Sequence, residues 1–102
     1  MLVTEIYNAL KQAQLVSTLE EYSTQWLNKH KTTASYLIHK KRDLSINAKI
    51  NCLKNINNKI YEIEHASTFQ KELENQKFIN LKISLNLLNK DLYYRFNVKI
   101  NI

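Results

Sequence analysis

The sequence contains no glycine and no proline, the two residues that most often form tight turns and end helices. Their absence excludes the glycine-rich loops that hold phosphate groups in Walker and dinucleotide-binding motifs. It also means that other residues must take the left-handed backbone conformations at turns. Asparagine is the best substitute, and the chain holds 13 asparagines, so we expect asparagine at such turns.

Cysteine is almost absent as well. Cys52 is the only one, which excludes an internal disulfide and a cysteine-based metal cluster. His30, His39 and His65 lack the spacing of zinc ligands, and no triad or nucleophile motif can be assembled, so we expect no metal, no cofactor and no enzymatic activity.

No apolar run approaches the roughly 18 residues of a membrane span, and the N-terminus lacks the features of a signal peptide. The expectation is a soluble cytoplasmic protein with no membrane partner.

Positive charge is abundant but unevenly placed. The net charge is +6, and residues 29–54 alone carry +6, with seven lysines and arginines against Asp43. Residues 1–28 give −2 and residues 55–102 give +2. Such a concentration is typical of a phosphate-binding surface. The alternative is an ordinary solvated lysine-rich face, because the excess of lysine over arginine resembles the codon bias of an AT-rich genome.

Apolar residues recur at helical spacing through most of the chain. Serines and threonines mark the predicted helix starts, since their side-chain oxygens can accept hydrogen bonds from the first backbone N–H groups. The predicted helices run from Thr4 to about Val16, from Thr18 to about Leu27, from Thr32 or Thr33 to about Lys41, and from Ser45 to about Ile60. The helical pattern then continues, and we expect a break near Ser67 that starts a fifth helix.

The last quarter of the sequence changes its period. Apolar and polar residues alternate from Ile79 to Leu87 and again from Tyr94 to Ile102, which predicts two antiparallel strands joined at Lys90-Asp91. A helical alternative uses Leu81, Leu85, Leu88, Leu92 and Phe96, but it leaves the other apolar positions of these runs unexplained. The predicted fold class is therefore α+β and mainly α, with four to five helices followed by a C-terminal antiparallel β-hairpin.

This pattern predicts two regions, a helical domain over residues 1–66 and a helix plus hairpin over residues 67–102. A two-stranded ribbon with one apolar face is not stable alone, so part of its cover is expected from a second copy of the chain. The expected homodimer interface consists of Leu81, Ile83, Phe96, Val98 and Ile100.

Residues from Glu5 to about Ile56 resemble the helix-turn-helix domain of the lambda-repressor type. The matching pieces are the segment 18–23 at the start of the first motif helix, Leu27-Asn28 where the family usually has Leu-Gly, Ser35-Tyr36-Leu37 in the recognition helix, and Ser45 at the start of the next helix. The chain is similar in particular to short bacterial and phage-borne proteins of this fold. It departs from the pattern at Asn28, near Lys41 and at Leu44, where the family has glycine, glycine and proline.

The resemblance implies a DNA-binding transcriptional regulator that inserts the helix at about 32–41 into the major groove of double-stranded DNA. The residues implied to contact bases are Lys31, Thr32, Thr33, Tyr36, His39 and Lys40. The residues implied to contact phosphates are Lys29, Lys41, Arg42 and Lys49. The alternative is a protein-binding module, for example a phage- or plasmid-encoded inhibitor of a host protein complex that uses the same basic face.

Overall fold

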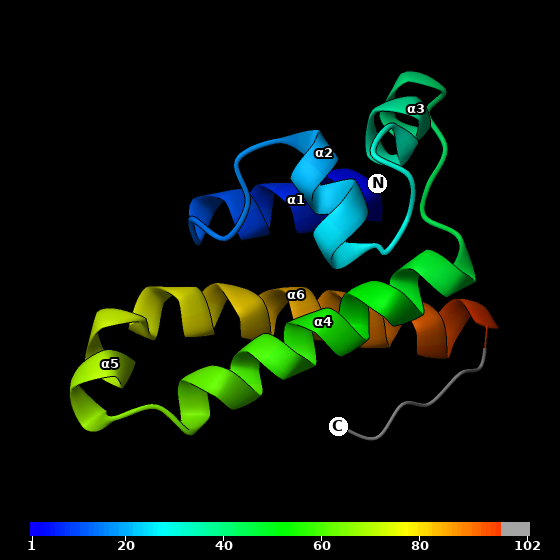
Figure 1. Cartoon of the computed structure of the whole chain (residues 1–102). Helices are drawn as coiled ribbons and strands as arrows, with labels where there is room; N and C mark the ends of the chain where they lie inside the picture. The colour runs from blue at the N-terminus through cyan, green and yellow to red at the C-terminus, as the bar shows by residue number, and fades with distance from the viewer. Residues whose placement is uncertain (97–102) are drawn as a thin grey trace.

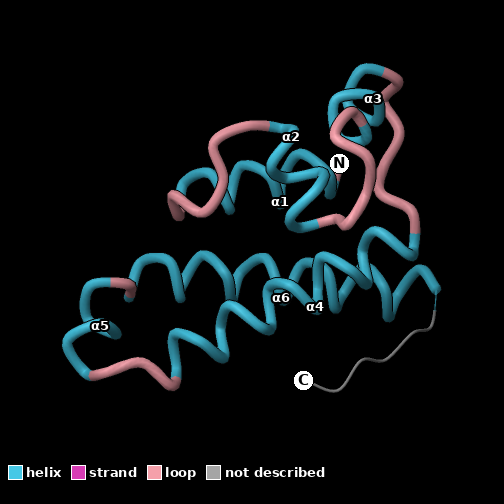
Figure 2. The backbone as a smooth tube through the Cα atoms, viewed as in Figure 1, coloured by secondary structure: helices cyan, strands magenta, loops and turns pink. Residues whose placement is uncertain are grey.

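The structure is a computed structural model that describes the backbone of residues 1–96 and the side chains of residues 1–94. Every regular element in this part of the chain is helical (Figures 1 and 2). The elements are α1 (Leu2–Gln12), α2 (Leu19–Glu21), the π-helical turn η1 (Tyr22–Trp26), α3 (Thr33–His39), α4 (Ile46–Glu64), α5 (Thr68–Leu73) and α6 (Asn75–Phe96).

The two longest helices, α4 and α6, pack side by side, and α5 connects them at one end of the molecule (Figure 1). α1 also packs on α6, and the α2–η1 segment packs on α4 and on α3. α3 lies at the end of the molecule opposite α5. Of the helices in Figure 1, α3 projects furthest from the α4–α6 pair.

A single hydrophobic core joins these helices. Its members come from α1, α2–η1, α3, α4 and α6, and they extend along the chain from Leu2 to Leu92. Tyr22 lies fully inside it, and its hydroxyl donates a hydrogen bond of 2.9 Å to the carbonyl of Val3. Trp26 is a core residue as well. The core thus includes residues of both regions, 1–66 and 67–102, that the sequence pattern separated.

The predicted C-terminal β-hairpin is wrong. Residues 75–96 form α6, and the expected turn at Lys90-Asp91 lies inside this helix. The helical alternative describes the packing, because Leu81, Leu85, Leu88 and Leu92 are between 0% and 6% exposed. Over the described residues the fold is all-helical instead of α+β. Val98 and Ile100, assigned to the second strand, lie outside the described residues.

The misassignment has a physical cause in the two apolar faces of α6. Successive residues of a helix are rotated by about 100°, so Ile79 and Ile83 project away from the buried leucine stripe. They are 43% and 50% exposed. Apolar residues on opposite faces of one helix give a sequence that alternates like a strand. Packing against α1 and α4 decides between the two structures, because these helices offer apolar surface to one leucine stripe.

Helix starts follow local capping chemistry in α4 and α5. The Ser45 hydroxyl accepts a hydrogen bond from the N–H of Ala48, and the Ser67 hydroxyl accepts one from the N–H of Gln70. The predicted break near Ser67 is therefore confirmed. α2 begins at Leu19, one residue later than predicted, because Thr18 is the capping residue that precedes the helix. α1 begins before Thr4, and its cap comes from a residue far away in the sequence.

Candidate nucleic-acid interface

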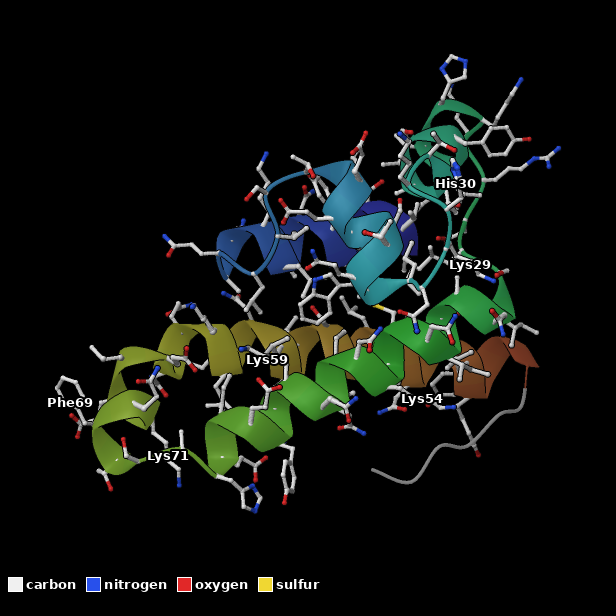
Figure 3. All side chains as sticks on the ribbon, in the orientation of Figure 1. Lys29, His30, Lys54, Lys59, Phe69 and Lys71 are labelled. Carbon is white, nitrogen blue, oxygen red and sulfur yellow. The ribbon has the colours of Figure 1, made fainter. Side chains whose placement is uncertain are left out.

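α3 is short and amphipathic, and its outer side is open to solvent. Ala34 is buried, whereas Tyr36 is 49% exposed and Thr32, His39 and Lys40 are exposed with it. Figure 3 shows the α3 side chains projecting away from α4 and α6, with His30 near the start of α3 and Lys29 between α3 and α4. The outer side of this helix is therefore accessible to a partner.

The start of α3 is tied to the helix before it by one buried hydroxyl. Ser23 is fully buried in η1, and its Oγ accepts a hydrogen bond of 2.9 Å from the N–H of Ala34. The same Oγ donates to the carbonyl of Leu19 at 2.9 Å. A larger side chain at this position would separate the two helices. Ser23 therefore sets both the close approach and the direction of α3.

The turn between η1 and α3 is fixed by amide side chains of α4. Asn51 Nδ2 donates to the carbonyl of Leu27 at 2.9 Å, and Asn55 Nδ2 donates to the carbonyl of Trp26 at 2.9 Å. These carbonyls end a helix, so they have no partner within it. Asn28 follows with a φ of 54°, the left-handed conformation that its place in the sequence predicted. α4 thus provides hydrogen-bond donors for the carbonyls at the end of η1 and holds the turn that leads into α3.

The loop after α3 is anchored by Asp43. Its carboxylate accepts hydrogen bonds from the N–H groups of Leu2 at 3.1 Å and Val3 at 2.8 Å, and so caps α1. It also accepts from the N–H of Leu44 at 2.9 Å. Burial by itself raises the pKa of Asp43, but these three hydrogen bonds and the positive charge of Lys49 outweigh it and hold the pKa below its usual value. Both ends of α3 are therefore attached to the rest of the molecule through polar side chains.

The residues around α3 form one basic segment, residues 29–42, which holds five lysines and arginines and no acidic residue. Lys31, Lys40, Lys41 and Arg42 are exposed. Among the side chains that the structure describes, no carboxylate lies within ion-pair distance of these four. Lys29 is half-buried, and its Nζ donates to Asn47 Oδ1 of α4 at 2.6 Å. Within the described side chains, the positive charge of Lys31, Lys40, Lys41 and Arg42 is therefore not neutralised by an ion pair.

The structure brings together nine of the ten predicted DNA-contacting residues. Thr33 is half-buried. The Oγ1 of its neighbour Thr32 lies 2.9 Å from His30 Nδ1, within hydrogen-bonding distance. The nine that lie in or beside α3 are Lys29, Lys31, Thr32, Thr33, Tyr36, His39, Lys40, Lys41 and Arg42. They form what we call the α3 face.

Lys49 does not belong to the α3 face, and its assignment as a phosphate contact is wrong. The residue is 1% exposed, and its ammonium group forms an ion pair with Asp91 of α6. Lys49 lies on the side of α4 that packs against α6, where a surface phosphate cannot reach it. Sequence alone treated all the lysines between 29 and 54 as one group, although the helix directs them to different sides.

The predicted dimer interface does not form one surface, because α6 puts Leu81 and Ile83 on opposite sides of the helix. Leu81 is fully buried in the core of its own chain, so it is not available to a second copy. Ile83 lies on the opposite side of α6 and is half-exposed. Phe96 is the last residue of α6. Val98 and Ile100 lie beyond the described part of the chain.

Sequence reasoning missed the residues that position α3. The sequence analysis used Asp43 only as a charge, the asparagines only as turn formers and Ser23 only as part of the segment 18–23. A signal was present in the four-residue spacing of Asn47, Asn51 and Asn55, which puts three amides on one side of a predicted helix. Where a helix has no glycine at its C-terminal end, such a row of amides on a neighbouring helix can donate hydrogen bonds to the free carbonyls at that end.

Other kinds of site find no support in residues 1–96. No group of three His, Cys, Asp or Glu residues there is placed to hold a metal ion. Cys52 is fully buried, and burial raises the pKa of its thiol to about 12. No helix in this range combines the length and the apolar content needed to cross a membrane.

Residues 3–93 match the model of a family of unknown function, DUF6626. The chain therefore belongs to this family, and the match extends from α1 into the last part of α6. Comparisons with curated proteins and with solved structures gave no match. The family description names no activity, so the repressor-type resemblance stays a prediction.

Proposed function

We propose that this protein is a DNA-binding regulator of transcription in the cytoplasm, and that α3 enters the major groove of double-stranded DNA. The observation that carries the proposal is the α3 face. It joins an exposed helix to five cationic side chains, with no acidic residue between positions 29 and 42. A duplex presents closely spaced phosphate charges, and lysine and arginine are the residues that bind them.

The backbone around α3 supports the repressor-type arrangement. The family that the chain resembles has glycine at the position of Asn28 and near that of Lys41, and glycine readily adopts left-handed conformations. Both residues have a φ of 54°, a conformation that is unfavourable for a lysine. These two left-handed residues, one before and one after α3, support the proposed motif in a chain without glycine.

The α3 face supplies two kinds of contact. Lys31, Thr32, Thr33, Tyr36, His39 and Lys40 lie at the start or on the outer side of the helix, where they would meet base edges. Lys29, Lys41 and Arg42 flank the helix and would bind the phosphates on either side of the groove.

The direct test is affinity for mixed-sequence duplex DNA as a function of salt concentration. Three phosphate contacts predict that log K falls with log salt with a slope of about −3. Replacing Lys41 or Arg42 with alanine should weaken binding to every sequence and reduce the slope by about 1. Lys71→Ala is the matched control, because it removes one exposed lysine from α5 at the opposite end of the molecule. It should leave the slope unchanged.

A second pair of variants separates base contacts from phosphate contacts. Replacing Thr33 or Tyr36 with alanine should mainly reduce discrimination between a selected high-affinity duplex and mixed DNA, with little change in salt slope. If all four substitutions have the same effect, the orientation of α3 in the groove is wrong. Absence of binding at low salt would contradict the proposal and favour an acidic protein partner for the α3 face, with the exposed Tyr36 near its centre.

A further inference from the structure

α6 has a second apolar face that the described part of the chain leaves exposed. Ile79, Ile83, Asn86, Lys90 and Tyr93 follow one another at spacings of four, three, four and three residues, and all five are exposed. This spacing puts them in one stripe along the helix, on the side opposite the buried leucines. We call this stripe the outer face of α6. A helix that is apolar on both sides is normally covered on both sides.

We infer that the outer face of α6 binds the same face of a second copy of the chain, with the two helices antiparallel. The inference does not depend on DNA binding. It rests on the self-complementarity that a two-fold contact requires, since each residue must meet a suitable residue of the identical surface.

The order of side chains along the stripe provides this complementarity. With the two-fold axis near Asn86, Ile79 lies opposite Tyr93 of the partner subunit, and Ile83 lies beside the aliphatic stem of Lys90 of the partner subunit. Asn86 then meets its own copy at the axis. A carboxamide both donates and accepts hydrogen bonds, so two copies can pair with each other. A single polar residue within such a stripe commonly fixes the register of paired helices.

Charge decides the direction of the two helices. Lys90 is the only charged residue of the outer face, and the one carboxylate between residues 75 and 94, Asp91, is paired with Lys49 of its own chain. Parallel helices would put the two Lys90 side chains together. An antiparallel pair centred on Asn86 separates them by eight residues, or about 12 Å along the axis, which exceeds the Debye length at physiological ionic strength.

The size of the contact predicts its strength. α6 has 22 residues, so it is about 33 Å long, and its outer face is smaller than the 20–30 residues a side of a standard stable interface. We therefore expect a dimer that dissociates in the micromolar range. The basic segment lies on α3, at the end away from α5, and is not part of this contact.

Sedimentation velocity of the full chain from low to high micromolar concentration tests the inference. The wild type should shift from monomer to dimer. Ile83→Glu should raise the dimer dissociation constant by about tenfold or more while keeping the helical circular dichroism spectrum. Phe69→Glu is the control, because Phe69 is an exposed apolar residue on α5 outside the outer face. A wild type that stays monomeric overturns the inference, as does loss of the dimer in Phe69→Glu but not in Ile83→Glu.

Cysteine cross-linking tests the direction and does not depend on the folding of Ile83→Glu. The native Cys52 is buried, so an added surface cysteine is the reactive one. With a short thiol-specific cross-linker, Asn86→Cys should form covalent dimers, because position 86 lies at the axis. Ile79→Cys should not, since the two copies of residue 79 are about 20 Å apart along the helices. Equal cross-linking at both positions, or none at position 86, overturns the antiparallel contact.

Discussion

At the scale of single residues, Asp43 connects parts of the chain that are distant in sequence. It follows the basic segment directly, yet its carboxylate caps α1, some 40 residues earlier. The cap satisfies backbone N–H groups that have no partner inside α1. The same contact fixes the loop that ends the α3 face, so Asp43 controls the position of residues that the proposal assigns to DNA contacts without being one of them.

Replacing Asp43 with alanine should lower the free energy of unfolding by about 1 kcal/mol, the usual effect of losing a helix cap. Urea denaturation at neutral pH measures this. Thr4→Ala is the control, because Thr4 is exposed and lies in α1 next to the cap without supplying it. A loss in Thr4→Ala equal to that in Asp43→Ala would contradict the assignment of the cap.

The same contact predicts a dependence on pH. The pKa of Asp43 is lowered in the folded state, so its stabilisation is fully present above the unfolded value near 4 and is lost as the pH falls through the folded value. The wild type should therefore lose more stability between neutral pH and about pH 3 than Asp43→Ala does. Parallel pH profiles for the two proteins would show that the carboxylate does not contribute.

At the scale of elements, a buried ion pair connects α4 to α6. Lys49 and Asp91 lie on facing sides of these helices, 42 residues apart, and Lys49 is almost completely removed from water. A buried ion pair is costly to break from one side, because the remaining charge stays in an apolar environment. The pair therefore favours one register of α6 on α4 over sliding of the leucine stripe.

Lys49→Ala should reduce the free energy of unfolding by about 3 kcal/mol or more, since it leaves Asp91 half-buried without its lysine. The double variant Lys49→Met with Asp91→Leu should recover much of this loss, because it replaces the pair by apolar groups of similar size. Thermal or urea unfolding measures both. Lys54→Ala, an exposed lysine of the same helix, should cost little. If Lys49→Ala is as mild as Lys54→Ala, the ion pair is not buried in solution.

At the scale of the whole molecule, α6 completes the core that supports the α3 face. Leu81, Leu85, Leu88 and Leu92 belong to the same cluster as Ile6 of α1 and Leu53 of α4. Without α6, the inner sides of α1 and α4 would be exposed to water. The family match, which extends to residue 93, is consistent with α6 being part of the folding unit.

A chain ending at residue 66 should therefore not fold on its own. Circular dichroism should show little helix and no cooperative unfolding transition, whereas the full chain should unfold in one transition. The boundary tested is the one that the sequence pattern predicted between its two regions. A cooperative transition in the shortened chain would show that residues 1–66 form an independent domain after all.

Much of the candidate site could be predicted from the sequence. The start of α3 near Thr32, its outer residues, the left-handed turn at Asn28 and the concentration of positive charge depend on nearby residues, and the structure has each of them. The spacing of the asparagines hints at one group of the side chains that hold α3. The backbone groups that Ser23, Asp43 and Asn55 bind could not be predicted, because these groups are remote in sequence or on another helix.

The sequence by itself determined the helices whose signals are local. Ser45 and Ser67 cap the helices that follow them, and their hydroxyls need only the backbone three residues ahead. Tertiary structure alone decided two questions: whether residues 79–96 form strands or a helix, and whether Lys49 faces water. Both answers depend on which side of α4 and α6 is buried. A pattern that is apolar on two faces fits more than one structure, and the surfaces of α1 and α4 select the helix by burying one face of it.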